Sequence, residues 1–434
     1  MNIIQASIPL FFILIALELL VARVRRQKRA RLNDSVADLS LGIFSQLAGI
    51  FTKLFSIGIY VAAVQTVAVQ RFAALPAWID RPPFHRSDAL LGLGIDWPAL
   101  ASWSVVFILV DLCYYCSHRL SHVVNVLWAG HVVHHSSEEY NLSVALRQSS
   151  LHGLFTWVFY LPLALIGVPA EMFIACYALN LVYQFWIHTR AVGRLGWLEA
   201  VMNTPSHHRV HHGVNPRYLD RNYAGVFIVW DRMFGTFEPE REQPVYGITT
   251  PLASWNPIWA NVHHFVEIAR KVWRADRWGD RWHFVFGHPA WRPASAGGPV
   301  VVAEVLPETF EKYDPPLPRA IGWYAVLQFA TILVVAVQLL ASAGTLQNGP
   351  LVALTFFVML SLVNVAGLME RQRWALAMEA ARLVAVAGAA AALSASGQNS
   401  PAISAALAAF AAGSGVWLIA LRRHLTAPLV VAVM

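Results

Sequence analysis

Histidines are the residues of this sequence whose type and spacing could do chemistry. The chain has 17 histidines in 434 residues, and ten of them lie in the strings HRLSH, HVVHH, HHRVHH and QFWIH. Imidazole is a ligand for Fe, Zn, Cu and Ni, so these strings predict a metal site. The candidate ligands are His118, His122, His131, His134, His135, His188, His207, His208, His211 and His212.

The spacing within the strings indicates helices. Residues three or four apart lie on one side of an α-helix, so positions i, i+3 and i+4 of each HxxHH string are expected to converge on one face. Eight or more ligands are too many for one ion, so the set predicts two. Both ions would be nitrogen-rich, unlike the carboxylate-bridged di-iron sites of soluble helix bundles. His207 and His152 fit this pattern less well than the other histidines.

Other polar residues near the strings are candidates for supporting roles. Asp111 lies seven residues before HRLSH on about the same helical face. It could orient a ligand histidine as a hydrogen-bond acceptor, or it could be an acid that reaches water at the interface. Asn203 and Asp231 are candidates for similar orienting roles. Arg209 and Tyr223 are candidate catalytic residues that would contact the polar end of a substrate or cofactor, or else are structural.

Apolar segments carry these strings. Hydrophobic residues make up 57% of the chain and charged residues 13%, whereas soluble domains contain about 25% charged residues. A membrane-spanning helix needs about 20 residues. The predicted fold class is therefore all-α, a polytopic transmembrane helical bundle with a histidine-rich cytoplasmic cap. The expected spans are residues 4–22, 38–66, 98–116, 151–167, 171–188, 321–342, 350–368, 374–394 and 400–421.

Four domains are expected along the chain. They are N-terminal anchor spans (1–97), a di-metal catalytic domain (98–270), a cytoplasmic connector (271–320) and a C-terminal transmembrane bundle (321–434). The segment 191–320 is rich in Trp, Pro, His and Arg, and Trp favours the membrane interface, so we expect a cap pressed against the membrane.

Charge distribution predicts the orientation. The basic run Arg23–Arg31 follows the first span, which places it in the cytoplasm, with the N-terminus outside and the C-terminus inside. Alternating spans then bring the histidines to the cytoplasmic side. Many arginines flank apolar segments, so the net charge of +7 predicts no nucleic-acid partner. The loop 71–97 falls outside in this scheme and is a mild contradiction, because it carries Arg71, Arg81 and Arg86.

The order HxxxH, HxxHH, HxxHH resembles the membrane fatty acid hydroxylase and sterol desaturase superfamily. The closer likeness is to the alkylglycerol monooxygenases, and it covers about residues 35 to 270. The matching stretches are WAGHVVHHSSEEYNLSVALRQS (128–149), YQFWIHT (183–189), NTPSHHRVHHGVN (203–215) and DRNYAGVFIVWDRMFGTFEPE (220–240).

This resemblance implies a membrane-bound ether-lipid monooxygenase that uses di-iron, O2 and a tetrahydropterin such as tetrahydrobiopterin. The carbon beside the ether oxygen is hydroxylated, and the unstable hemiacetal splits into an aldehyde and a glycerol derivative. The lipid would enter from the bilayer, at the cytoplasmic face of a bacterial inner membrane. The resemblance also implies which residues bind metal, namely His118, His122, His131, His134, His135, His188, His208, His211 and His212, with His207 less certain.

Two residues depart from the pattern of the animal enzymes. Those enzymes have an acidic residue directly after the second histidine of HxxxH, where this chain has Val123. They also tend to have Glu after His-Thr, where this chain has Arg190. If those acids help to bind cofactor or protons, the cofactor or substrate of this protein differs.

Several alternatives remain open from the sequence. The same site would serve a fatty acid, sterol or carotenoid hydroxylase or desaturase. A metal transporter or sensor would place its ligands at the bilayer midplane with acidic partners, whereas these histidines lie at span ends. Histidine ligands do not distinguish iron from zinc. No GxGxxG motif follows a strand, so electrons must come from a diffusible cofactor or a protein donor. The oligomeric state stays open.

Overall fold

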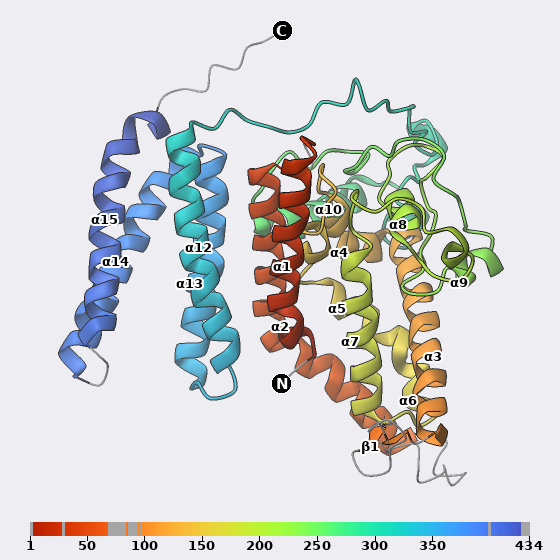
Figure 1. Cartoon of the computed structure of the whole chain (residues 1–434). Coiled ribbons are helices and arrows are strands. Elements are labelled where there is room, and N and C mark those ends of the chain that lie inside the picture. Colours follow the sequence, from red (N-terminus) through yellow and green to blue (C-terminus); the bar gives the residue numbers. More distant parts are fainter. Residues whose placement is uncertain are drawn as a thin grey trace. The chain divides into compact units, whose positions relative to one another are not determined.

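The structure is a computed structural model that describes residues 3–27, 31–67, 84–85, 94–95, 97–397 and 401–426. These residues are mostly helical and form two compact units (Figure 1). The first unit contains Met1–Leu252 and Asn261–Lys312, and the second contains Ala253–Ala260 and Tyr313–Met434. The predicted loop arginines Arg71, Arg81 and Arg86 lie outside the described residues, so their placement stays a prediction.

Four long helices organise the first unit. Helix α3 packs against α4 and α7, and α7 also packs against α1. The ends of α3 and α7 that lead into the histidine strings lie at the same end of the unit, beside α4 and α8 (Figure 1). The long helices are α1 (Ile3–Val24), α2 (Leu32–Val67), α3 (Trp97–Val123) and α7 (Ala170–Trp186).

Short elements connect and cover these helices. Two short strands, β1 (Phe84–His85) and β2 (Gly94–Ile95), pair in an antiparallel ribbon. The short helices of the first unit are α4 (Asn125–His135), η4 (Val144–Leu146), α5 (His152–Thr156), η5 (Trp157–Tyr160), α6 (Leu161–Leu165), η6 (Gly196–Ala200), α8 (Pro205–His211), α9 (Val229–Met233), α11 (Trp278–Phe286) and η7 (Ala294–Ala296). Helix α10 (Pro257–Arg274) begins in the second unit and continues in the first.

The segment predicted as one span over 151–167 is an apolar helical run, His152–Leu165, that is shorter than predicted and is not one regular α-helix. This segment is broken into α5, η5 and α6, which lead from the histidine-bearing end of the unit towards the start of α7 (Figure 1). Pro162 has no N–H to donate, and its ring would clash with the carbonyl four residues earlier in a continuous helix. The chain therefore forms one turn of 3₁₀-helix before restarting with Pro162 in the first turn of α6.

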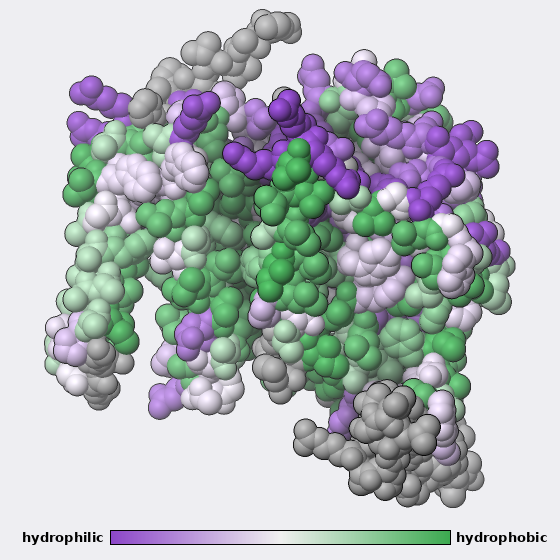
Figure 2. Space-filling model, viewed as in Figure 1, coloured by the Kyte–Doolittle hydropathy of each residue, from purple (hydrophilic) through white to green (hydrophobic). Residues whose placement is uncertain are grey.

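The other expected spans agree better with the structure. Seven described helices are long and apolar enough to cross a membrane, and α7, over the predicted span 171–188, is a 17-residue helix. In the first unit, apolar side chains cover the flanks of the long helices, and hydrophilic ones gather at the end that holds α8 (Figure 2). The protein is thus an all-α, multi-pass integral membrane protein. Trp273, Trp278 and Trp282 on α10 and α11 are 67–87% exposed, which is compatible with a cap at the membrane interface.

The second unit is built from four helices with a polar cluster in its core. Glu379 accepts hydrogen bonds from Tyr324, Asn364 and Arg382, all of which are buried. Buried charges in apolar surroundings are tolerated when they are paired in this way. The helices are α12 (Arg319–Ser342), α13 (Asn348–Met369), α14 (Arg373–Ser396) and α15 (Pro401–Thr426).

Candidate metal centre

Helix α3 carries the HxxxH string at its C-terminal end, as the sequence predicts. With 27 residues it rises about 40 Å, longer than a hydrocarbon core of about 30 Å. Its last turns, with His118 and His122, therefore lie at one end of the span. Helix α4 follows almost directly and supplies HVVHH, and α8 supplies the third string, with His212 at its C-cap. His188 comes two residues after the end of α7.

The structure gathers nine of the ten predicted ligands into two groups, and all nine side chains are buried. Within each group, the candidate ligand atoms all lie within 4.8 Å of one another. The first histidine group is His118, His122, His131, His135 and His211. The second histidine group is His134, His188, His208 and His212.

The three histidines of each HxxHH string do not converge on one face, so that prediction is wrong in detail. Neighbouring residues of a helix point about 100° apart, so adjacent histidines diverge. Helix α4 sends its i and i+4 members to the first group and its i+3 member, His134, to the second. Helix α8 does the reverse, because His208 and His212 join the second group and His211 joins the first. Each helix therefore serves both groups.

Main-chain carbonyls fix the orientation of several rings. The Nδ1 atom of His118 lies 2.7 Å from the Tyr223 carbonyl, and that of His211 lies 3.0 Å from the Arg221 carbonyl. A carbonyl oxygen only accepts, so each Nδ1 carries the hydrogen and each neutral ring presents its Nε2 lone pair. The buried Nε2 atoms of His122 and His211 have no hydrogen-bond partner among the described residues.

The second histidine group shows most directly that this donor set fits a metal. Nδ1 of His134 donates to the Arg147 carbonyl at 3.0 Å, and Nδ1 of His188 donates to the Gln184 carbonyl at 2.7 Å. When the rings are neutral, each Nε2 atom therefore carries a lone pair and no hydrogen, yet the two Nε2 atoms lie 3.2 Å apart. Two lone pairs repel and cannot form a hydrogen bond. A cation bound by both atoms would turn this repulsion into attraction.

Burial keeps the histidine side chains of α4 and α8 neutral, which is the form that binds metal. It lowers the pKa of His134 to about 4 and that of His211 to about 3. These imidazoles are therefore neutral at pH 7, which is the metal-binding form. Burial, followed by the neighbouring imidazoles, also lowers the pKa well below 6.5 for His131, His135, His208 and His212.

His207 belongs to neither group, although the sequence includes it among the ligands. It precedes His208 by one residue, so it points to another side of α8. Its ring lies edge-on to Phe237, with the centroids 5.3 Å apart. His152 also lies outside both groups, although its ring centroid is 4.9 Å from that of His131.

Asp111 does not contact a histidine, so its predicted direct role is wrong. Its carboxylate is fully buried and accepts hydrogen bonds from the main-chain N–H groups of Val226 and Phe227 at 2.8 and 3.0 Å. The indole of Trp230 and the amide of Asn180 also donate to it, at 2.9 and 2.6 Å. These four donors replace water, which excludes the alternative of an acid at the interface. Asp111 instead anchors the loop after α8 to α3.

Asn203 and Asp231 hold the same loop. Asp231 accepts from the main-chain N–H groups of Tyr223 and Ala224 at 2.8 Å, and Asn203 donates to the Ala224 carbonyl at 2.6 Å. The loop in turn presents the Tyr223 carbonyl to His118. Asp111, Asn203 and Asp231 therefore support the histidines indirectly, by fixing the backbone of this loop.

The two remaining candidates are buried beside the histidines. The ring centroid of Tyr223 lies 5.2 Å from that of His122, so its contact with a substrate stays a prediction. Arg209 is fully engaged within the protein. It pairs with both carboxylate oxygens of Glu240 at 2.6 and 2.7 Å and donates to the carbonyls of Thr189 and Val192. These contacts agree with the structural role that the sequence left open as the alternative for Arg209.

Sequence reasoning missed Arg147, Asp38 and Glu18. Arg147 is buried, pairs with Asp38 of α2 at 3.1 Å, and donates to the Val133 carbonyl at the end of α4. Glu18 of α1 accepts from the main chain of Leu142 and from the side chain of Thr189, next to His188. The sequence did contain a signal for them. Glu18 and Asp38 each lie inside an apolar helix, where an unpaired charge is costly, so each acid needs a partner.

Comparison with known proteins identifies the family. The chain is 36% identical to alkylglycerol monooxygenase of Homo sapiens over 384 residues, which is 87% of this chain and 80% of that protein. The chain belongs to the alkylglycerol monooxygenase family. The Danio rerio relative is 35% identical over 391 residues, covering 88% of this chain and 81% of that protein. The family is one of oxygen-dependent, membrane-bound monooxygenases.

The family assignment agrees with the position of the site. The fatty acid hydroxylase family model matches residues 103–236, which include all nine grouped histidines. A more distant relative is the ornithine lipid hydroxylase OlsE of Rhizobium tropici, 28% identical over 161 residues, or 36% of this chain and 49% of that protein. No solved structure has significant similarity to the chain. A metal site for oxygen chemistry thus has support from both the geometry and the family.

Proposed function

We propose that this protein is a di-iron monooxygenase that cleaves the O-alkyl bond of an ether lipid such as an alkylglycerol. One oxygen atom of O2 enters the C–H bond beside the ether oxygen, and the other leaves as water. The hemiacetal then collapses to an aldehyde and a glycerol derivative. The observation that carries the proposal is the pair of buried histidine groups, in each of which the candidate ligand atoms lie within 4.8 Å of one another. In the second group, two Nε2 lone pairs also face each other at 3.2 Å, as atoms that share a cation would.

The protein's own residues would hold and shield this centre. Bound iron would supply the oxygen chemistry, which zinc cannot, since zinc has no redox chemistry. The main-chain carbonyls of Tyr223, Arg147 and Gln184 hold the imidazoles in the metal-binding tautomer. Burial of all nine rings excludes water from the reacting atoms.

The position of the site suits a lipid substrate. The histidines lie at the ends of apolar helices, so a lipid can reach them from the bilayer without passing its tail through water. We place this end of the helices on the cytoplasmic side of a bacterial inner membrane, because the basic run that begins at Arg23 follows the first span. Two electrons must come from outside the chain, and tetrahydrobiopterin is the donor that the family assignment favours.

A purified preparation tests this function directly. Metal content is measured first, and the protein is then incubated with an alkylglycerol and O2, with and without tetrahydrobiopterin. We expect about two irons per chain and aldehyde release that depends on the pterin. Aldehyde release without pterin would reject tetrahydrobiopterin as the donor and leave the ether-lipid reaction intact. Hydroxylated ornithine lipids, fatty acids or sterols in place of aldehyde would reject the ether-lipid substrate.

A further inference from the structure

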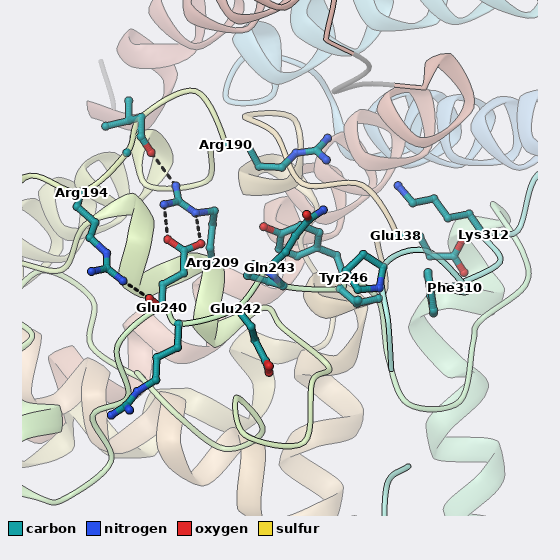
Figure 3. Close-up of a pocket in the computed structure, with 16 residues that line it drawn as sticks. Glu138, Arg190, Arg194, Arg209, Glu240, Glu242, Gln243, Tyr246, Phe310 and Lys312 are labelled. Carbon is teal, nitrogen blue, oxygen red and sulfur yellow. Dashed lines mark hydrogen bonds and ion pairs between the residues drawn. The ribbon is translucent and has the colours of Figure 1, made fainter. Parts of the chain in front are cut away.

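A polar cavity lies in the first unit beside the second histidine group. Its volume is about 550 Å³, within the range of roughly 300–1,000 Å³ that holds small ligands and cofactors. Three loop segments outside the membrane-spanning helices form it, over residues 190–194, 240–246 and 307–312 (Figure 3). The mechanism described above does not use this cavity.

An aromatic stack connects this cavity to the metal centre. Tyr246 lines the cavity and stacks on Tyr140, with ring centroids 4.6 Å apart and planes 9° apart. The Tyr140 ring in turn lies 5.2 Å from the ring of His212 and 5.9 Å from that of His188. Tyr246 is 7% exposed, and the guanidinium carbon of Arg190 lies 6.0 Å from its ring centroid. A planar molecule that contacts the exposed part of this ring would be two aromatic rings away from the second histidine group.

The walls of the cavity suit a polar ligand better than a lipid tail. They carry five cationic and three anionic side chains, together with the polar main chain of the loops. Most of the cations are held in place, since Arg190 pairs with Glu139 at 2.7 Å and Lys312 pairs with the same carboxylate at 2.5 Å. Arg241 pairs with Glu238 at 3.2 Å, and its side chain is 60% exposed. The charged residues of the wall are Glu138, Arg190, Arg194, Arg209, Glu240, Arg241, Glu242 and Lys312.

We propose that this cavity binds the reductant, a small, planar, polar heterocycle, and that Tyr246 and Tyr140 form the route for its electrons. This inference rests on the proposed monooxygenase function, which requires an external donor. The reductant gives up two electrons and two protons for each O2. One oxygen atom enters the C–H bond and the other is released as water, so the electrons balance. A small donor is favoured over a protein because the binding surface is a cavity of about 550 Å³ lined by charged side chains.

Variants at Tyr246 distinguish the contribution of the aromatic ring from that of its hydroxyl group. Tyr246→Phe keeps the stacked ring, and Tyr246→Leu removes it. Tetrahydrobiopterin is the probe, and its binding to the full-length protein is measured by calorimetry without lipid. The rate of iron reduction is followed spectroscopically with the pterin and, separately, with dithionite, which needs no cavity. Arg241→Gln tests the wall, and Arg274→Gln, at an exposed position at the end of α10, is its matched control.

The two tyrosine variants should differ. Loss of one aromatic contact weakens binding roughly 2- to 10-fold, so we expect this loss in Tyr246→Leu but not in Tyr246→Phe. Iron reduction by the pterin should slow in Tyr246→Leu, while reduction by dithionite stays at the wild-type rate. Arg241→Gln should bind the pterin more weakly, and Arg274→Gln should bind it normally.

Other outcomes would overturn the inference. Wild-type binding and reduction in both Tyr246→Leu and Arg241→Gln would show that the donor docks elsewhere. Competition for the cavity by a short, tail-free glycerol ether would assign it to the lipid head group. Failure of the proposed function looks different, because the wild-type protein would then bind pterin with Tyr246-dependence and still release no aldehyde.

Discussion

The buried pair of Arg147 and Asp38 offers a quantitative test of how the metal centre is supported. Arg147→Met keeps much of the side chain's volume but removes the charge that faces Asp38 at 3.1 Å. It also removes donors to the Val133 carbonyl and to the Ser136 hydroxyl, at 2.7 Å each. The main-chain carbonyl that orients His134 is still present, because it does not depend on the side chain.

The expected loss of stability is large because a charge is left alone. Both side chains are almost fully buried, at 3% and 0% exposure. Breaking such a pair by removing one partner costs about 3–5 kcal/mol, whereas replacing both partners by neutral groups is often near neutral. The double variant Asp38→Asn/Arg147→Met should therefore recover most of the stability that Arg147→Met loses. The amide oxygen that replaces the carboxylate in this variant can still accept the hydrogen bond that Ser143 donates to Asp38 at 2.8 Å.

Thermal or denaturant unfolding in detergent micelles measures these differences, and mass spectrometry measures the metal content of each variant. Arg217→Met, at an exposed position, serves as a control and should unfold like the wild type. We expect metal content to fall in the single variant and to return in the double variant. Additive losses, with the double variant less stable than either single variant, would refute the reasoning, because additivity means that the two side chains do not interact.

Three further predictions test the centre itself. His211→Ala should lower the metal content by about one ion per chain, since it removes a ligand of the first histidine group, whereas His207→Ala should leave both ions and activity in place; mass spectrometry distinguishes these outcomes. Asp111→Asn should destabilise the protein by roughly 2–6 kcal/mol, because the amide can satisfy only two of the four buried donors and each orphaned donor costs about 1–3 kcal/mol; unfolding in detergent checks this. The metal-free protein should lose stability as pH falls from 6.5 to about 4, because the pKa of His134 is about 4 in the folded state, so that the unfolded chain binds more protons in this window; unfolding curves at pH 7, 5.5 and 4 measure the slope, and a flat profile would contradict it.

Much of the centre could be predicted because helical periodicity is local. The spacing of HRLSH and HVVHH indicates which residues share a helix, and apolar length indicates where the spans are. The structure confirms seven long apolar helices, and it gathers every predicted histidine except His207. The break at Pro162 was also readable in principle, since proline in a helix interior removes a hydrogen bond. Apolar composition over 151–167 outweighed that signal in the prediction.

The rest depends on contacts between distant residues. Asp111 carries no sign in the sequence that its partners are the main-chain groups of Val226 and Phe227, more than 100 positions away. The division of the histidines between two groups depends on how α4 and α8 face each other. Arg147 lies within residues 128–149, which resemble the family, but its role depends on a contact with Asp38 of α2. Spacing predicts which residues can meet, and tertiary packing decides which do.

The way α4 and α8 divide their histidines links metal binding to the fold. Each helix gives two ligands to one group and one ligand to the other, so neither group can form unless both helices are in place. The first group also needs α3, and the second needs the segment after α7. A cation bound only by the folded arrangement stabilises it by mass action. The two ions would therefore act as cross-links among these four segments, and bound metal would remove the repulsion between the Nε2 lone pairs of His134 on α4 and His188 after α7.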